Sequence, residues 1–278
     1  MQYSAFARAV LQYYDKFVAS VICHIEGIFL TINVTKLSQK GHIGPVRTAM
    51  QRNATAMRRM IVPMFVCALG AASPAMASED TQHWETLTLN VALPDSFKLQ
   101  SETVARTGDA KGFYEIEENV MVGKKLNKTV TVWLGYTFNP TYSHGTFQRR
   151  EHRFRQQVNF DNVLVLGKAK VSGRMRLEER WREGLPGTGW RLRPQEKIAM
   201  PLVGKTTLTL SSEQFFNLNT MSFQKTSGLD RMRNAISIGM PLSKKVSVDV
   251  GYLNQHGFVR NGPDTSDHVL TLGLTASL

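Results

Sequence analysis

The fold of this 278-residue chain is decided by a stretch in which charged and apolar side chains alternate, Arg174-Met175-Arg176-Leu177-Glu178-Glu179-Arg180-Trp181. Successive side chains of a β-strand point to opposite faces, so the three arginines and Glu178 share one face. Met175, Leu177 and Trp181 share the other. A helix would scatter both sets around its axis. The stretch therefore predicts a strand with one charged face and one apolar face.

The same two-residue period recurs along residues 84–278, in blocks separated by Gly, Pro, Asn and Asp. Eleven strands are predicted, at 84–93, 96–106, 113–122, 129–138, 148–160, 168–182, 189–200, 206–216, 229–240, 245–255 and 267–278. Because bacterial single-chain membrane barrels have an even number of strands, the expected number is ten or twelve.

The polar faces of several strands carry arginine at strict two-residue spacing, with glutamates among them. A soluble β-sandwich would instead scatter polar residues over its outer faces. In a membrane barrel the charged rows line the lumen and the apolar rows meet lipid. We therefore predict an all-β, antiparallel up-and-down transmembrane barrel of about 10–12 strands with an Arg/Glu-rich interior. The residues predicted to line its lumen as a charge network are Arg153, Arg155, Arg174, Arg176, Glu178, Arg180, Arg191, Arg193, Glu213, Arg231 and Arg233.

Residues 57–77 are predicted to be a secretory signal peptide. Met57-Arg58-Arg59-Met60 is a basic start, an apolar run extends to Ala72, and small residues at Ala75 and Ala77 form an A-x-A cleavage site. The apolar run is too short for a transmembrane helix. We expect cleavage near Ala77, and a barrel domain that comprises residues 78–278.

Residues 1–56 precede this signal, which is unusual because such signals begin a chain. We interpret them as a spurious or disordered extension, with translation starting at Met57 or Met60. The alternatives are a cytosolic domain or a membrane anchor in the semi-apolar run 17–34. A charged residue in mid-span, Glu26, would cost about 2.5–3.5 kcal/mol on insertion scales and weakens the anchor interpretation.

Charge and cysteine content exclude several functions. The formal net charge is +12, but residues 1–77 hold eight of the 34 basic residues and two of the 22 acidic ones. Half of the excess thus lies at the front, and nucleic-acid binding is not expected. Cys23 and Cys67 are the two cysteines of the chain, so no disulfide framework or thiolate metal site is expected after residue 77, and no cofactor is implied.

No catalytic motif stands out, and we predict that the protein is not an enzyme. The alternative is a lipid hydrolase with a nucleophile near the barrel rim, for which Tyr142-Ser143-His144-Gly145 offers a Ser and a His. Small polar residues are expected in such a loop anyway, and neighbours on a strand point to opposite faces.

The order of several motifs resembles a known bacterial family. These motifs are Trp133-Leu134-Gly135-Tyr136, Arg150-Glu151-His152-Arg153, Arg176-Leu177-Glu178-Glu179-Arg180, Arg191-Leu192-Arg193, Ser212-Glu213-Gln214-Phe215-Phe216-Asn217, Asp230-Arg231-Met232-Arg233-Asn234 and Gly251-Tyr252. The family is the domain of unknown function 2490, and the resemblance spans residues 84–278. It implies an exported outer-membrane barrel and transfers no catalytic residue.

The lumen is the most informative candidate site. With Arg149 added to the nine arginines above, ten face five acids, namely Glu102, Glu151, Glu178, Glu213 and Asp249. Two interpretations are open, a cross-linked plug and an anion-favouring pore or cavity. We expect Glu178 to pair chiefly with Arg153 or Arg193, because an unpaired buried charge is costly.

The resulting expectation is an outer-membrane β-barrel of a Gram-negative bacterium, structural or passing solutes passively. Its expected partners are outer-membrane lipids, lipopolysaccharide and the barrel-assembly machinery. The alternative from another class is a secreted soluble β-protein that binds a ligand in a polar cavity. The chain ends in Leu278, whereas outer-membrane barrels usually end in an aromatic residue.

Overall fold

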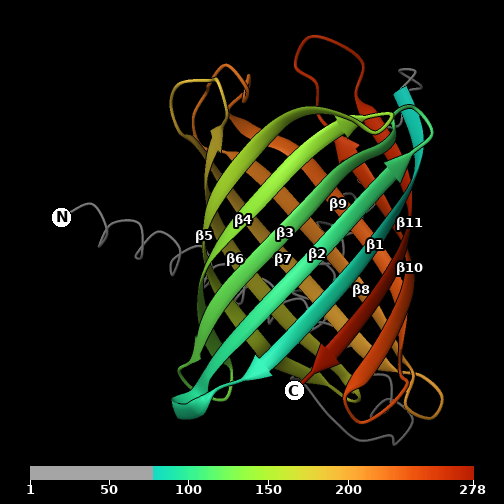
Figure 1. The fold of residues 1–278 in the computed structure, drawn as a ribbon. Coiled ribbons are helices and arrows are strands. Elements are labelled where there is room, and N and C mark those ends of the chain that lie inside the picture. Colours follow the sequence, from blue (N-terminus) through green and yellow to red (C-terminus); the bar gives the residue numbers. More distant parts are fainter. Residues whose placement is uncertain (1–77) are drawn as a thin grey trace, which may run out of the picture. The chain divides into compact units, whose positions relative to one another are not determined.

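The computed structural model describes residues 78–278, which form eleven β-strands closed into a barrel (Figure 1). The strands are β1 (Ser78–Ala92), β2 (Phe97–Gly108), β3 (Gly112–Lys125), β4 (Val130–Ser143), β5 (Thr146–Leu166), β6 (Ala169–Arg182), β7 (Gly189–Pro201), β8 (Thr207–Asn217), β9 (Gly228–Pro241), β10 (Val246–Gly257) and β11 (Thr265–Ser277). A short 3-10 turn, η1 (Pro94–Ser96), joins β1 to β2. No helix among residues 78–278 has both the length and the hydropathy of a membrane span. The predicted extension at 1–56 and the predicted signal at 57–77 lie outside the described residues.

Each of the eleven predicted strands is present, and the all-β barrel class is confirmed. Most of the strands are longer than predicted: β1 begins at Ser78, and β5 continues to Leu166 beyond a register shift between Phe160 and Leu164. The added start of β1, residues 78–83, is polar and shows no alternation of polar and apolar residues. In β5 the polar pair Asp161-Asn162 interrupts the pattern before the apolar residues 163–166.

The expectation of an even strand number is wrong. Strands that are neighbours in sequence pair antiparallel, whereas β1 and β11 pair parallel, with Ser78 opposite Thr265 and Asn90 opposite Ser277. A meander with an odd number of strands has first and last strands that run the same way. Its closing seam must therefore be parallel.

The barrel is inverted in polarity relative to a soluble domain. Its buried residues in the described part comprise 21 polar or charged side chains and eight large apolar ones. Outward residues such as Leu270, Leu272 and Leu274 of β11 are instead 54%, 48% and 40% exposed. The alternation seen in the sequence thus places charge inside and apolar side chains outside.

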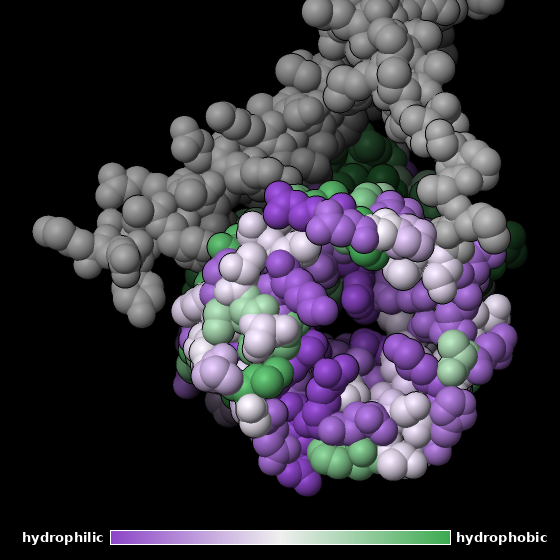
Figure 2. Space-filling model, turned by 90° about the horizontal axis from the view of Figure 1, so that it is seen from above, coloured by the Kyte–Doolittle hydropathy of each residue, from purple (hydrophilic) through white to green (hydrophobic). Residues whose placement is uncertain are grey.

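The two ends of the barrel differ in their connections. The longer ones, 183–188, 218–227 and 258–264, lie at the upper end in Figure 1 with the turn 144–145. At the lower end, where β11 ends, the turns are short, and Gly167 and Gly204 adopt φ of 60° and 64°. These left-handed conformations favour glycine. From above, hydrophilic residues surround a central depression (Figure 2).

Candidate functional site

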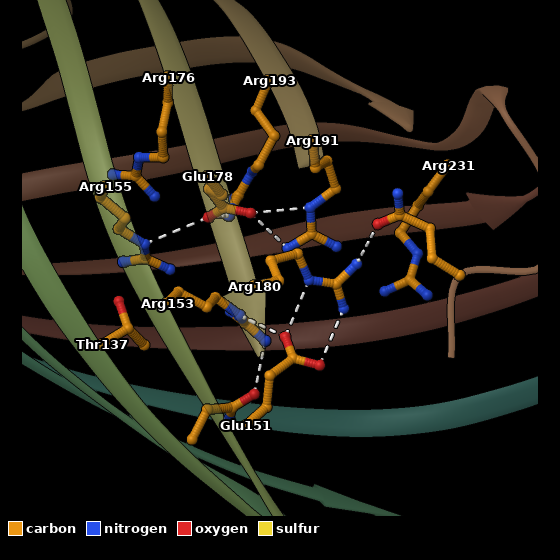
Figure 3. A network of polar contacts seen from close by, with 12 residues as sticks. Thr137, Glu151, Arg153, Arg155, Arg176, Glu178, Arg180, Arg191, Arg193 and Arg231 are labelled. Carbon is orange, nitrogen blue, oxygen red and sulfur yellow. Dashed lines mark hydrogen bonds and ion pairs between the residues drawn. The ribbon is translucent and has the colours of Figure 1, made fainter. Parts of the chain in front are cut away.

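The interior of the barrel holds a continuous network of arginines and glutamates, drawn mainly from β5, β6 and β7 (Figure 3). On these strands every second residue points inward, so the alternation that forms the strand also delivers the charges. All eleven residues predicted from the sequence for a lumen network lie within this interior. The further residues that contribute to the network are Trp84, Arg106, Glu115, Glu117, Glu151, Arg182 and Phe215.

Glu178 of β6 is the most buried carboxylate of the network, with no exposed surface. Its Oε1 accepts hydrogen bonds from Arg155 Nε at 3.2 Å and from Arg193 Nη1 at 2.7 Å, and its Oε2 accepts two from Arg191, at 2.5 and 2.8 Å (Figure 3). Of the two partners that the prediction named, Arg193 is therefore the one that pairs with Glu178, and Arg153 pairs with Glu117 and Glu151 instead.

Glu151 of β5 is the second carboxylate that several arginines share, and we call each such carboxylate a centre. Arg153 pairs with Glu151 and not with Glu178. Glu151 accepts from Arg153 Nε at 2.7 Å, from Arg180 Nε and Nη2 at 2.9 and 3.0 Å, and from Arg182 Nε at 2.6 Å. The fork of Arg180 thus grips both carboxylate oxygens, which is the strong bidentate arrangement.

Glu117 of β3 is a third centre that the sequence prediction missed. It accepts from Arg153 Nη1 at 3.0 Å, from Arg155 Nη2 at 2.6 Å and from Arg106 Nη2 at 3.4 Å. Arg106 also pairs with Glu115. The two glutamates stand at two-residue spacing inside the predicted strand 113–122, so the same alternation rule could have found them.

Glu213 of β8 closes the network on the side opposite Glu117. It accepts from Arg193 Nε and Nη2 at 3.2 and 2.9 Å, pairs with Arg174, and lies 4.0 Å from Arg233. Because Arg193 contacts both Glu178 and Glu213, the centres are linked and each carboxylate is shared.

Two aromatic rings fill the gaps between guanidinium groups, and neither was predicted as part of the site. Arg106 and Arg233 lie 4.3 and 4.7 Å from the Trp84 ring centre. The Phe215 ring lies 4.3 Å from Arg193 and 4.7 Å from Arg233. Cation–π contacts of this kind stabilise arginines that have no carboxylate to themselves.

The network carries surplus positive charge. Nine arginines share five glutamates through ion pairs: Arg106, Arg153, Arg155, Arg174, Arg180, Arg182, Arg191, Arg193 and Arg233 with Glu115, Glu117, Glu151, Glu178 and Glu213. Arg176 and Arg231 make no ion pair with another described residue. Arg176 donates to the amide oxygen of Gln157 and Arg231 to that of Gln255, and Arg231 also lies 5.9 Å from the Phe215 ring centre. Even with Glu102 and Asp267, which border the network, eleven arginines face seven acids.

Two residues counted as inward charges in the sequence lie apart from the network. Arg149 is exposed at the start of β5. Asp249 lines a cavity of about 470 Å³ at the lower end, together with Lys197, Lys205 and several Ser and Thr residues. The lumen thus has a packed charged middle and an open polar space below it.

The rim near the upper end is held by a separate contact. Asp264 accepts hydrogen bonds from the Val259 backbone N–H at 2.9 Å and pairs with His256 Nε2 at 3.0 Å. The Val259 N–H, followed by His256, holds the pKa of the Asp264 carboxyl below its ordinary value. The connection 258–264 is therefore tied to the end of β10.

The Ser143–His144 pair is in contact but lacks a third member. Ser143 Oγ lies 3.3 Å from His144 Nδ1, so the two side chains meet across the turn instead of pointing to opposite faces. No carboxylate among the described residues pairs with His144, and no group of three potential metal ligands occurs within residues 78–278.

The fold and the interior together define a closed β-barrel with a charged lumen. The chain belongs to the family described as "Protein of unknown function (DUF2490)", which matches residues 81–266. The resemblance inferred from the motif order is thereby confirmed.

Two further comparisons describe what the chain is similar to. An uncharacterized protein of Methylorubrum extorquens strain AM1 is 29% identical over 223 residues, which cover 78% of this chain and 96% of the relative. Among solved structures, the anion-selective porin from Comamonas acidovorans matches with a TM-score of 0.32 and 13% identity. That match covers 66% of this chain and about half, 53%, of the porin.

Proposed function

We propose that residues 78–278 form an integral outer-membrane barrel of a Gram-negative bacterium, whose lumen favours anions. The observation that carries this proposal is the inverted polarity, with arginines in excess inside and apolar side chains outside. Monomeric soluble proteins rarely expose contiguous apolar patches of more than a few hundred Å². A closed barrel also leaves no unpaired sheet edge in lipid.

The apolar outer face of the barrel supports the proposal that its partners are membrane lipids. Rows such as Leu270, Leu272 and Leu274 would contact outer-membrane lipids and, toward the outer leaflet, lipopolysaccharide. The longer connections would face outward and the short turns the periplasm, as in other bacterial barrels. Export through the predicted signal peptide and insertion by the barrel-assembly machinery complete the proposal. No nucleic-acid partner and no cofactor belong to it.

The contacts within the lumen support the proposal that the barrel is closed at rest. The Arg/Glu centres on β3, β5, β6 and β8 span the middle of the interior, so the network acts as a plug. Surplus guanidinium groups favour anions in any path that passes it. The proposed role is therefore structural, with passive and anion-favouring solute passage when the plug loosens.

We propose no catalytic role. A rim hydrolase needs a base oriented by a third group, and His144 has no such partner among the described residues. In a lipid-release assay, the Ser143→Ala variant should behave as the unaltered protein does. Activity that disappears in this variant would contradict a non-enzymatic barrel.

The decisive test is fractionation of cells that express the protein from Met57, with gel mobility measured before and after boiling. A heat-modifiable band in the outer-membrane fraction is expected. In a second measurement, the purified barrel in planar bilayers should show a low conductance, with a reversal potential that indicates anion preference. A soluble periplasmic band of unchanged mobility would refute the barrel in the membrane, and would favour a soluble protein that uses the polar cavity.

A further inference from the structure

Arg176 is the one deeply buried arginine of the interior that has neither a carboxylate nor an aromatic partner among the described residues. It is 6% exposed, and its Nε donates to Gln157 Oε1 at 2.6 Å. Its Nη1 and Nη2 groups donate to no other described residue, and no dashed contact reaches it in Figure 3. Arg231, the other arginine without an ion pair, is less buried and lies beside Phe215.

The neighbours of Arg176 increase its need for negative charge. In the strand register it lies directly between Gln157 of β5 and Arg193 of β7. Arg174 stands two residues away on the same inward face, and its buried Nε has no hydrogen-bond partner. A buried charge without compensation is costly. The carboxylate nearest along β6, Glu178, is already shared by Arg155, Arg191 and Arg193.

Across the strands at the level of Arg176, a residue of β4 supplies another unused hydrogen-bond donor. Trp133 of β4 is opposite Gln157, and its buried Nε1 makes no hydrogen bond with a described residue. Unused donors therefore recur on β4 and β6 at this height of the lumen. Buried polar groups are nearly always paired, so these donors give this height of the lumen the capacity to hydrogen-bond an acceptor-rich group.

The cavity below gives such a group a way in. Its wall includes Gln195, which is opposite Arg174, and Lys197, one inward position lower on β7. The same wall holds two ammonium groups, of Lys197 and Lys205, and one carboxylate, of Asp249, so its formal charge is positive. A volume of about 470 Å³ admits small solutes, and these ammonium groups draw anions toward Arg176.

We infer that Arg176, with Arg174 beside it, is a binding site for a small oxyanion that carries a phosphate or carboxylate group. The planar Nη1/Nη2 fork suits two oxygens of one such group, whereas chloride is a single atom and cannot accept in this bidentate way. This inference deepens the proposed function, on which it rests for access of anions to the lumen.

The test is calorimetric titration of the folded barrel in detergent with inorganic phosphate, succinate and chloride. Phosphate or succinate should bind at one saturable site at least about tenfold more tightly than chloride, as expected for an added charge-assisted hydrogen bond. Arg176→Gln should weaken that binding at least about tenfold. Arg150→Gln is the matched control, because it removes one positive charge from an exposed rim pair with Glu183 and should leave the affinity unchanged.

A second variant guards against misfolding. Arg176→Lys retains the charge and removes the fork, and it should also bind more weakly if it shows the same heat-modifiable band. Equal affinity in Arg176→Gln and Arg150→Gln, wild-type affinity in Arg176→Lys, or no saturable oxyanion binding would each overturn the site. Conductance is measured separately. A barrel that binds phosphate but never conducts would refute the proposed passage of anions and leave the binding site standing. A barrel that conducts anions without binding phosphate or succinate would refute the binding site and leave the proposed passage standing.

Discussion

At the scale of single residues, the interior depends on carboxylates that are each shared by several guanidinium groups. Glu178 is fully buried and serves three arginines, on β5 and β7. Desolvation of such ions is expensive, and the pairing must offset it. The loss of one carboxylate therefore leaves several charges unpaired at once.

We predict that Glu178→Gln destabilises the barrel by about 3–5 kcal/mol, the range for breaking a buried pair. The measurement is urea unfolding of the reconstituted protein, followed by tryptophan fluorescence. Glu183→Gln is the control, because its pair with Arg150 is exposed and should contribute at most about 1 kcal/mol. Equal stability of the two variants would mean that the network is not held by Glu178.

A second residue-scale prediction concerns the fit of Trp133 against β3. A Cβ atom on Gly123 would lie 2.5 Å from the Trp133 ring, whereas one on Gly239 would have no atom closer than 3.8 Å. Gly123→Ala should therefore cost about 1–3 kcal/mol through overpacking, and shift the tryptophan emission. Gly239→Ala should be close to neutral in the same unfolding experiment, and the opposite ranking would contradict the described packing.

At the scale of strands, the parallel seam between β1 and β11 is the feature that distinguishes this barrel. Thirteen consecutive residues of each strand are in register, from Ser78–Thr265 to Asn90–Ser277. In a barrel with an even number of strands, the last strand would run antiparallel to β1 at this seam. The seam is thus where the strand number can be tested directly.

We predict that Asn90→Cys combined with Ser277→Cys forms a disulfide on oxidation, since neighbouring strands lie about 4.8 Å apart. Residues 78–278 contain no cysteine, so the bond would be read without background as a change in mobility of the boiled protein. Gln82→Cys with Ser277→Cys is the control, because Gln82 is opposite Val269. Cross-linking in the control and not in the test pair would indicate a different closure.

At the scale of the whole molecule, the barrel separates a charged interior from an apolar exterior. Ile238 and Ser237 of β9 show the division in adjacent residues: Ile238 is 44% exposed on the outer face, and Ser237 lines the interior cavity. One added charge should have opposite consequences at the two positions.

We predict that Ile238→Lys reduces the folded, heat-modifiable fraction, because a lysine facing lipid costs about 2–4 kcal/mol near the bilayer midplane. Ser237→Lys should fold normally, since the cavity offers room and water. Quantified unboiled bands from outer-membrane fractions give the comparison. Equal folding of both variants would indicate that the outer face does not meet lipid.

The sequence alone determined the strands, the two faces of each strand and the charged rows, because side-chain direction in a strand follows from the two-residue period. That period needs no knowledge of neighbours, and it located all eleven strands, although the even strand numbers of bacterial barrels led to an expected number of ten or twelve. It could not give the closure, since the direction of the seam depends on how many strands the closed sheet contains.

Which charges pair with each other depends on the closed barrel and cannot be derived from the strand pattern. Glu178 pairs with Arg155 and Arg191, which stand opposite it in the register, whereas Glu117 on β3 reaches Arg155 on β5 across the intervening β4. Contacts of the second kind depend on strand stagger and barrel curvature. They drew Arg153 away from Glu178 and left Arg176 without a carboxylate, which no local pattern of residues could reveal.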